Sequence, residues 1–508
     1  MKVFAHNALH GAGIAALIFF PEYQLVLFNQ HPAFMHTPLP LTCFALATIA
    51  NLILTALLLA LALTWMQTTP LGHCVQVYAP AGCASAAYES AAILSGSASM
   101  LRGFTAFCAC ALLAMWYVYR FRPAAYRQIQ AVLSAAGVGL AVFCLFVSVQ
   151  LVWIALWRPA VRSLAPAVVA RAPGDAVRPR VVWILMDELS YAQVFGERAQ
   201  GLSLPNFDAF RRVSTLFTDV QPVANYTELA VPSLLEGRQV KRIKYTFSGR
   251  LLLAFPGGPL SPFQAAETPF ALAKRQEMTT GAVGWYNPYC SMLAPFLDAC
   301  YWTDTATSLG SPVTAKTFRM FLVKPWEDDW SIFRPGGQRP DAVRQRDDYL
   351  NLDRRAQIMA GDDRFDFIFL HLPLPHPPGF YSRRTGQFDT SGRASYLDNL
   401  ALADKTLGEL LAILRASPRW STTSVVLCGD HSWRTYLWRK SAEWTPEDNA
   451  ASHGGIFDPR PMLMVHRAGQ TAPETIDHPV PLLEVHALLD ELLQPPSGKP
   501  NLRTSASR

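Results

Sequence analysis

The sequence predicts two differently solvated parts, an N-terminal α-helical transmembrane bundle followed by an α/β domain with a mostly parallel central sheet. Of the 508 residues, 51% are hydrophobic and only 16% are charged, whereas about 25% of residues are charged in an average soluble protein. Only seven charged residues lie before residue 158. Beyond it, short apolar runs alternate with patterns of helical period. This composition excludes a purely soluble enzyme, a disordered chain and a small disulfide scaffold.

Three long apolar stretches predict membrane spans. Residues 41–66 (LTCFALATIANLILTALLLALALTWM) contain no charged side chain, and about 20 residues suffice to cross a bilayer. Residues 128–157 are also uncharged. Residues 103–119 are shorter but end in tryptophan and tyrosine residues, which favour the membrane interface. We expect all three stretches to span.

Two further stretches and one basic loop bear on the number and direction of the spans. A proline and a glutamate interrupt residues 8–28, and residues 81–100 fit either a packed helix or a loop. Lys and Arg favour short cytoplasmic loops, and residues 120–127 (RFRPAAYR) are the clearest such loop. We therefore expect four or five helices in residues 1–157, five fitting better, with the first helix as an uncleaved anchor. The expected location is a multi-pass protein of a bacterial inner membrane, with the large domain on the periplasmic side.

The cysteines give a check on this location. Cys290 and Cys300 are the only close pair in the outer domain. A disulfide between them would suit an oxidising compartment, although two unrelated thiols remain an alternative.

The second part of the chain has the pattern of an α/β domain. Residues 158–180, rich in Pro, Ala and Arg, form the predicted linker, residues 181–493 the domain, and residues 494–508 a disordered tail. Buried parallel strands are predicted by continuous apolar runs, and helices by apolar residues at helical spacing. The predicted strands are residues 181–186, 365–370 and 424–427, and the predicted helices are residues 396–415 and 480–493.

Acidic and imidazole side chains follow the predicted strands directly. Asp187 and Glu188 come after the first strand, and Asp430 and His431 after the last. Ligands bind at the carboxyl ends of such strands, so these residues converge in space. A carboxylate and an imidazole offered from neighbouring strand ends can hold one metal ion.

Three more histidines lie in loops suited to a site. His371 and His376, in FLHLPLPHPPGFY, follow the middle strand in a proline-rich loop. His453 precedes two glycines, which allow backbone to approach a ligand closely. Each histidine taken alone could instead be an ordinary loop or core residue.

Thr227 is the candidate nucleophile. It lies in ANYTELAVPSLLEGR, where a helix could start, five residues before Pro232. A hydroxyl beside a divalent ion at a helix N-terminus can become an alkoxide. The alternative is that Thr227 only caps the helix, with Glu228 in the first turn.

The order of these segments resembles that of the alkaline phosphatase and sulfatase superfamily. The segments are a strand followed by DE, then NYTELAVPSLLEGR, HLPLPHPP, a YLDN helix, GDHS and HGG. In particular, the chain is similar to its membrane-anchored branch, the phosphoethanolamine and phosphoglycerol transferases. The resemblance covers about residues 180–493 and implies an alkaline phosphatase-like or sulfatase-like fold. Sulfatases of this fold carry Cys or Ser in a C/S-x-P/A-x-R signature that is oxidised to formylglycine, whereas this chain has TELAVPSLLEGR. Sulfate-ester hydrolysis by that route is therefore not expected.

The resemblance also implies roles for single residues. Thr227 matches the threonine nucleophile and a metal ligand, Asp430 and His431 match paired metal ligands, and either Asp187 or Glu188 matches the ligand after the first strand. The histidines match positions that contact the transferred group or a second metal. These are His376 and His453, with His371 a weaker match.

The implied activity is a metal-dependent, two-step transfer. Thr227 takes a phospho-head-group, of phosphoethanolamine or phosphoglycerol type, from a membrane phospholipid and passes it to an envelope glycan or lipid. His376 or His453 protonates the leaving diacylglycerol oxygen. Ligation by Asp, His and Thr favours Zn²⁺ or Mn²⁺ over Ca²⁺, and no nucleic acid is expected as partner. The alternatives are a phosphodiesterase or sulfuric-ester hydrolase of the same fold, and an inactive membrane scaffold.

Overall fold

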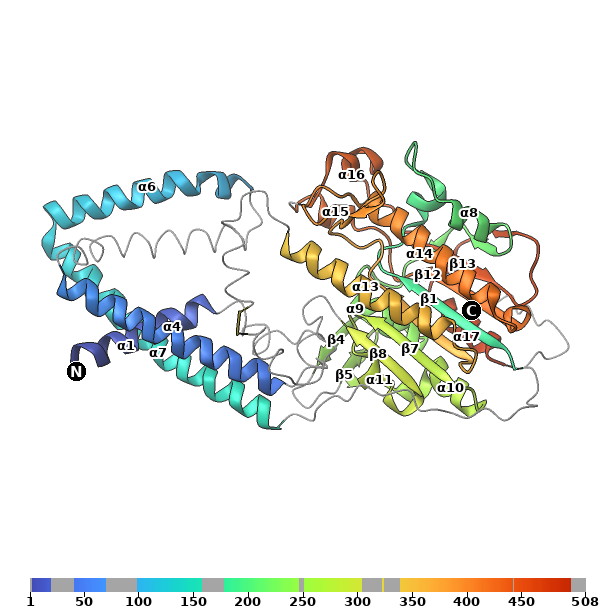
Figure 1. The fold of residues 1–508 in the computed structure, drawn as a ribbon, viewed down its shortest axis with the longest axis horizontal. Helices are drawn as coiled ribbons and strands as arrows, with labels where there is room; N and C mark the ends of the chain where they lie inside the picture. Colours follow the sequence, from blue (N-terminus) through green and yellow to red (C-terminus); the bar gives the residue numbers. More distant parts are fainter. Residues whose placement is uncertain are drawn as a thin grey trace. The chain divides into compact units, whose positions relative to one another are not determined.

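The computed structural model describes most of the chain in eight segments and divides it into two compact units, an N-terminal group of helices and an α/β domain (Figure 1). The described residues are 2–19, 41–69, 98–157, 178–245, 251–303, 322–323, 339–441 and 443–494. Most of the predicted linker, and all but the first residue of the predicted tail, lie outside these segments.

The helical unit contains α1 (Lys2–Ile18), α4 (Leu41–Thr68), α6 (Ala98–Phe121) and α7 (Pro123–Trp157). Helices α1, α4 and α7 pack around a small apolar cluster that includes Phe19, Leu52 and Leu151. A Cβ added at Gly11 would lie 2.4 Å from the carbonyl oxygen of Ala56. The absence of a side chain at Gly11 therefore allows α1 and α4 to approach closely.

The predicted bundle of four or five spans is not confirmed. Among the described residues, one helical stretch, Ala45–Trp65, is long and apolar enough to cross a membrane. The apolar parts of α6 and α7, Cys110–Phe121 and Gly139–Trp153, are shorter. Helix α1 ends at Ile18, and the rest of the predicted span 8–28 and most of residues 81–100 lie outside the described residues.

An eight-stranded sheet forms the centre of the α/β domain. Its strand order is β14 (Glu474–Ile476), β2 (Thr215–Phe217), β13 (Leu463–His466), β12 (Thr423–Gly429), β1 (Arg180–Met186), β9 (Phe367–Leu372), β7 (Thr280–Trp285) and β8 (Ala299–Thr303). The five strands from β12 to β8 run parallel to one another, and β13 is antiparallel to both of its neighbours, β12 and β2. The predicted α/β fold with a mostly parallel sheet is confirmed.

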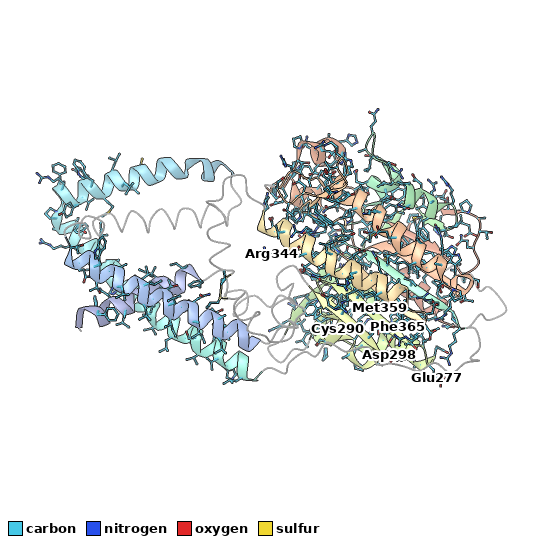
Figure 2. All side chains as sticks on the ribbon, viewed as in Figure 1. Glu277, Cys290, Asp298, Arg344, Met359 and Phe365 are labelled. Atoms are coloured by element: carbon cyan, nitrogen blue, oxygen red, sulfur yellow. A yellow bond between two sulfur atoms is a disulfide. The ribbon has the colours of Figure 1, made fainter. Side chains whose placement is uncertain are left out.

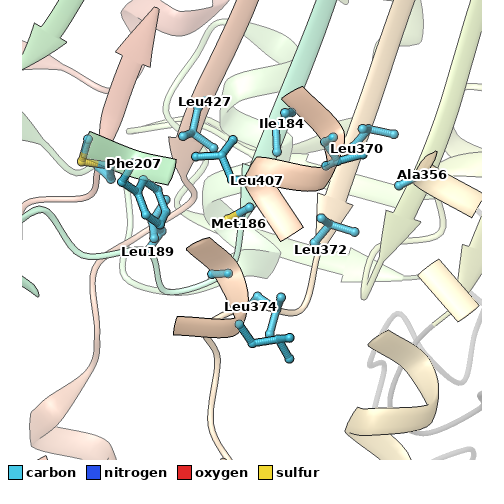
Figure 3. Close-up of a cluster of buried hydrophobic side chains, with 14 of the residues drawn as sticks. Ile184, Met186, Leu189, Phe207, Ala356, Leu370, Leu372, Leu374, Leu407 and Leu427 are labelled. Carbon is cyan, nitrogen blue, oxygen red and sulfur yellow. The ribbon is translucent and has the colours of Figure 1, made fainter. Parts of the chain in front are cut away.

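The sheet is covered on both faces, and successive residues of β1 alternate between two cores. Val182, Ile184 and Met186 pack with α8 (Pro205–Arg211), α13 (Pro340–Ala360) and α14 (Tyr396–Ala416), and Figure 3 shows part of this core. Val181, Trp183 and Leu185 pack with α9 (Thr227–Glu236), α10 (Pro269–Arg275) and α17 (Glu484–Leu492). Because successive side chains of a strand point to opposite faces, the side chain directly after β1 points toward the face that α9 covers, and the next one would point to the opposite face.

Shorter elements complete the domain. Two strand pairs are β3 (Val220–Gln221) with β15 (Val480–Pro481), and β10 (Tyr381–Ser382) with β11 (Gln387–Phe388). A three-stranded sheet consists of β4 (Arg242–Tyr245), β5 (Leu251–Ala254) and β6 (Leu260–Pro262). The short helices are α11 (Tyr289–Met292), α15 (Thr435–Trp438) and α16 (Pro446–Ala451). Single turns of helix occupy Ala192–Gly196, Ala265–Glu267, Ala294–Phe296 and Trp420–Thr422.

A disulfide joins Cys290 of α11 to Cys300 of β8, and Figure 2 labels Cys290 among the side chains of the domain. The bond ties a helix to the edge strand of the main sheet.

One predicted strand is displaced along the sequence. The strand predicted at residues 365–370 is β9, which begins two residues later and continues to Leu372. His371 therefore lies inside the strand rather than in the loop that follows it. Its alternation with Phe367 and Phe369 directs it to the face that α9 covers.

Gly429, the last residue of β12, packs closely against the backbone that follows β1. A Cβ at this position would lie 2.5 Å from the carbonyl oxygen of Leu189, which is backbone and cannot rotate away. We predict that Gly429→Ala lowers the free energy of unfolding by about 1–3 kcal/mol, the usual cost of overpacking. Urea unfolding of the full-length protein measures this change.

Gly258→Ala is the matched control, because the added Cβ there meets only an ordinary contact at 3.6 Å. Equal stability of the two variants would contradict the close approach of the two backbone segments.

Candidate active site

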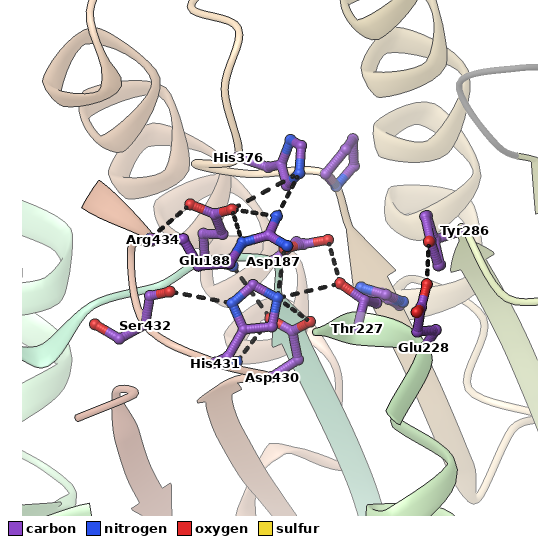
Figure 4. A network of polar contacts seen from close by, with 12 residues as sticks. Asp187, Glu188, Thr227, Glu228, Tyr286, His376, Asp430, His431, Ser432 and Arg434 are labelled. Carbon is purple, nitrogen blue, oxygen red and sulfur yellow. Dashed lines mark hydrogen bonds and ion pairs between the residues drawn. The ribbon is translucent and has the colours of Figure 1, made fainter. Parts of the chain in front are cut away.

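Helix α9 positions Thr227 at its first turn. The N-cap is Tyr226, which has an extended backbone and makes no side-chain capping bond. Thr227 is 5% exposed, and its hydroxyl donates to Asp187 Oδ2 at 3.1 Å and lies 3.3 Å from His431 Nε2 (Figure 4). Thr227 is therefore not the helix cap, and its oxygen faces a carboxylate and an imidazole.

The parallel register of β1 and β12 brings Asp187 and Asp430 together. Met186 is the partner of Gly429, so the two aspartates leave neighbouring strands at the same level. Alternation along each strand directs both toward the face that α9 covers. Ligand atoms of Asp187, Asp430 and His431 all lie within 4.8 Å of one another, and all three residues are fully buried.

This cluster fits a divalent metal ion. Asp187 Oδ1 and Asp430 Oδ2 are buried and have no hydrogen-bond partner among the described residues. Burial raises the pKa of Asp187 well above its usual range, and the charges of Asp430 and Glu188 raise it further. Burying two carboxylates without a cation is unfavourable, so a bound cation would satisfy both the free oxygens and the charge.

Glu188 turns away from this cluster. Its backbone is left-handed, with φ of 62°, and its carboxylate accepts from the Arg434 guanidinium at 2.6 Å and from Trp438 Nε1 at 2.9 Å. Burial raises the pKa of Glu188, but Arg434, followed by His376 and His431, outweighs burial and leaves the pKa below its usual value. Asp187 therefore faces Thr227, while Glu188 is the counter-ion of a buried arginine. Both also belong to a second possible ligand group with His376.

His376 lies at the edge of the same network. Arg434 Nη2 donates to His376 Nε2 at 3.2 Å, and Asn399 holds the loop by donating to the His376 carbonyl at 3.1 Å. Burial, together with the charge of Arg434, lowers the pKa of His376 to about 4. The Nε2 atom of His376 accepts a hydrogen bond from Arg434, and its role as proton donor stays a prediction.

His371 is fully buried, and its hydrogen bond goes to a residue outside the network. Its Nδ1 lies 2.6 Å from the Tyr289 hydroxyl, and its Nε2 has no hydrogen-bond partner among the described residues. Burial lowers its pKa to about 4. The prediction that His371 contacts substrate stays a prediction.

His453 is also separate from Thr227. It has a left-handed backbone, with φ of 49°, and its side chain is 64% exposed. Its Nε2 lies 3.4 Å from Glu197. Within the described part of the chain, no hydrogen bond or ion pair connects His453 to the metal-binding cluster.

The sequence interpretation missed Arg434. It treated Trp438 as a possible sugar or acyl platform, or as a core residue, and did not connect it with Glu188, to which it donates. Arg434 stands four residues after Asp430, in DHSWR. The sequence did contain a signal for a buried arginine. Asp187, Glu188 and Asp430 follow neighbouring strands, and three buried carboxylates require a cationic side chain as well as a metal ion.

The profile of the Sulfatase family matches residues 179–458, which is more than half of the chain. This range contains every active-site residue named in this subsection. The chain belongs to the sulfatase family. It is an enzyme of the sulfatase and alkaline phosphatase superfamily, whose members are metal-dependent, and its Asp187, Asp430 and His431 could hold the ion.

Solved structures of this superfamily resemble the chain at low identity. Ps i-CgsB in complex with a neocarrahexaose is 17% identical, with a TM-score of 0.42, and the match covers 62% of this chain and 72% of that one. Phosphonate monoester hydrolase of Agrobacterium radiobacter is 14% identical, with a TM-score of 0.37 and coverages of 62% and 74%. The lipoteichoic acid synthase LtaP from Listeria monocytogenes is 15% identical, with a TM-score of 0.37 and coverages of 62% and 72%. No curated protein matches the sequence.

The pairing of Glu188 with Arg434 generates a stability prediction. Arg434→Met leaves a buried carboxylate without its counter-ion, which typically costs about 3–5 kcal/mol. We expect urea unfolding at pH 7 to show a loss of this size.

The control is the double variant Glu188→Gln/Arg434→Met, which removes both charges and should recover most of the loss. A double variant as unstable as Arg434→Met would show that the ion pair is not the cause.

Proposed function

We propose that this sulfatase-family enzyme is a membrane-anchored, metal-dependent transferase. It moves a phospho-head-group, of phosphoethanolamine or phosphoglycerol type, from a membrane phospholipid to an envelope glycan or lipid. The observation that carries the proposal is the Thr227 hydroxyl, which is buried at the start of α9 within hydrogen-bonding distance of Asp187 and His431. A hydroxyl in this setting is suited to act as a nucleophile.

The proposed reaction has two displacements. The Thr227 oxygen attacks the phosphorus of the donor diester, the bond to the diacylglycerol oxygen breaks, and that oxygen takes up a proton. An acceptor hydroxyl then attacks the phosphothreonine, and the Thr227 oxygen leaves and regains its proton. The Thr227 hydroxyl donates to Asp187 Oδ2, so Asp187 is positioned to take the hydroxyl proton when Thr227 attacks in the first step. His376 or His453 is the proposed donor of the leaving-group proton, and of the two His376 is joined to the active-site network, through Arg434.

The ligand set supports a particular class of metal. Two carboxylates, an imidazole and a hydroxyl favour Zn²⁺ or Mn²⁺ over Ca²⁺, which prefers oxygen ligands alone. A divalent ion held by Asp187, Asp430, His431 and Thr227 would lower the pKa of the hydroxyl and neutralise charge that develops on the phosphoryl oxygens.

The identity of the nucleophile favours phosphoryl over sulfuryl transfer. Formylglycine forms from Cys or Ser in the sulfatase signature, and Thr227 stands where this chain resembles that segment. A threonine cannot supply the formylglycine aldehyde, but its alkoxide can form a phosphoester.

Exposed apolar side chains support a lipid substrate and a membrane location. Helix α4 carries several leucines about half exposed. Arg120, Arg122 and Arg127 lie where α6 ends and α7 begins, and such a basic junction favours the cytoplasmic side of a membrane. In the α/β domain, Tyr226, which precedes Thr227, is 43% exposed, and Leu437 of α15 is 41% exposed. The exposed ring of Tyr226, next to the nucleophile in the sequence, is suited to the acyl-chain side of a phospholipid.

A covalent adduct on Thr227 is the direct consequence of this mechanism. We predict that full-length protein, incubated with phosphatidylethanolamine or phosphatidylglycerol and no acceptor, gains the mass of one phospho-head-group. Intact-protein mass spectrometry measures the gain, and peptide mapping assigns it to Thr227.

Thr227→Ala should lose both adduct and transfer, whereas Thr227→Ser keeps a hydroxyl and should retain part of each. An adduct released to water in the presence of glycan and lipid acceptors would indicate the phosphodiesterase alternative. A wild-type protein that never carries an adduct, with Thr227→Ala fully active on a phosphodiester or sulfate ester, would refute the nucleophile. No turnover of either ester would leave the scaffold alternative.

A further inference from the structure

Large apolar side chains are exposed beside the candidate active site. Among the described residues of the α/β domain, six such side chains are exposed, and three of them are Tyr226, Leu437 and Ile456. Tyr226 directly precedes Thr227, and Leu437 follows Arg434 by three residues. Ile456 is the most exposed of the six, at 68%. Exposed apolar side chains that gather in one place mark an interaction surface, whereas single scattered ones need no explanation.

Side-chain contacts join the three segments that carry these residues. The ring of Tyr436, next to Leu437, packs edge-on against the ring of Phe457, next to Ile456, with centroids 5.0 Å apart. The side chains of Tyr226 and Tyr436 also interact. Tyr436 and Phe457 are half-buried, so each still presents part of its ring. We call the surface formed by Tyr226, Tyr436, Leu437, Ile456 and Phe457 the aromatic rim.

Arg434 connects the aromatic rim to the active-site network. Its guanidinium binds Glu188 and lies 5.5 Å from the centre of the Tyr226 ring. Tyr226 is also the N-cap residue of α9, whose first residue is Thr227. A lipid that contacts the rim would therefore have its head group close to the start of α9.

Two cationic side chains without partners adjoin the aromatic rim. Arg439 and Lys440 directly follow α15, both are exposed, and neither side chain has a hydrogen bond or an ion pair with a described residue. Arg439 also lies against the segment of Ile456, since a Cβ added at Gly455 would be 2.9 Å from Arg439 Cδ. The two positive charges are therefore available to an external partner.

Acidic side chains close to the rim in the sequence or in space are already paired. The pairs are Asp458 with Arg460, Glu443 with Arg339, and Glu197 with His453, the last at 3.4 Å. The unpaired charges beside the rim are thus positive, which matches an anionic partner.

We propose that the aromatic rim docks on the surface of an anionic lipid bilayer. Leu437 and Ile456 enter the boundary between head groups and acyl chains, the tyrosines lie at the level of the head groups, and Arg439 and Lys440 contact anionic head groups. Tyrosine favours the membrane interface, and cations beside apolar side chains strengthen binding to anionic lipid.

The choice of a bilayer over a protein rests on the proposed function. A protein seated on the rim would lie across the start of α9 and hinder the approach of a donor to Thr227, whereas a bilayer is itself the source of the donor. The inference deepens the proposed function by naming the surface of the α/β domain that meets the lipid.

Photo-crosslinking tests this contact without requiring turnover. The photoreactive residue p-benzoyl-phenylalanine replaces Ile456 in the full-length protein, which is reconstituted in nanodiscs of phosphatidylcholine and phosphatidylglycerol. After irradiation, mass spectrometry of the peptide that contains residue 456 measures the fraction that carries a lipid. We expect a lipid adduct at residue 456.

Ile358 is the matched control, because it is an isoleucine of similar exposure, 59%, outside the rim. It lies near the end of α13, which leads to the start of β9, at the edge of the sheet opposite to Thr227. The same photoreactive residue at position 358 should give no lipid adduct above background.

A charge-removing variant tests the cations. Arg439→Gln/Lys440→Gln is combined with the photoreactive residue at position 456. Each cation near an anionic membrane surface strengthens association about fivefold. Loss of both should therefore lower the lipid adduct severalfold in nanodiscs that contain phosphatidylglycerol and leave it unchanged in phosphatidylcholine alone. Arg354→Gln is the control, because Arg354 is an exposed arginine of α13 outside the rim.

A lipid adduct at residue 456 no greater than at residue 358 overturns the proposal. So does a crosslink from residue 456 to protein in place of lipid, which would assign the rim to a protein partner or a second copy of the chain. An adduct that Arg439→Gln/Lys440→Gln leaves unchanged overturns the match to anionic lipid. If docking fails, a phospho-head-group on wild-type Thr227 would still support the transferase. Lipid at residue 456 with Thr227 never modified would keep the docking surface and remove the proposed function.

Discussion

The site depends on the parallel register of β1 and β12, which buries two aspartates side by side. Because Met186 pairs with Gly429, Asp187 and Asp430 leave their strands at one level and face the same helix. Each keeps one carboxylate oxygen without a hydrogen-bond partner among the described residues, and His431 Nε2 lies 3.7 Å from that of Asp187 and 3.3 Å from that of Asp430. Such an arrangement is costly unless a cation joins it, so the fold itself creates the requirement for a metal ion beside Thr227.

A second charge balance separates two adjacent acids. Asp187 continues the alternation of β1 toward α9, whereas Glu188 adopts a left-handed backbone and reaches the guanidinium of Arg434. The pKa of Asp187 is raised and that of Glu188 is lowered. Asp187 is thus placed to bind a metal ion, whereas Glu188 binds the guanidinium of Arg434.

Much of this arrangement could be predicted from the sequence, because it follows from short-range patterns. Continuous apolar runs identified three strands, and acidic residues directly after them identified where a site would form. The choice between Asp187 and Glu188 could not be predicted, since it depends on one backbone dihedral and on Arg434. His371 was misplaced because β9 extends two residues further than its apolar run indicates. Among the described helices only Ala45–Trp65 meets the length and hydropathy of a membrane span, so the predicted number of spans stays a prediction.

The position of the metal ion tests the central claim most directly. Anomalous diffraction from crystals of the full-length protein, recorded at the absorption edge of Zn²⁺ and of Mn²⁺, would locate the ion. The account predicts one ion at about 2.0–2.2 Å from Asp187 Oδ1, Asp430 Oδ2, His431 Nε2 and the Thr227 oxygen. An ion bound instead by Glu188 and His376, with Thr227 outside its coordination sphere, would contradict it.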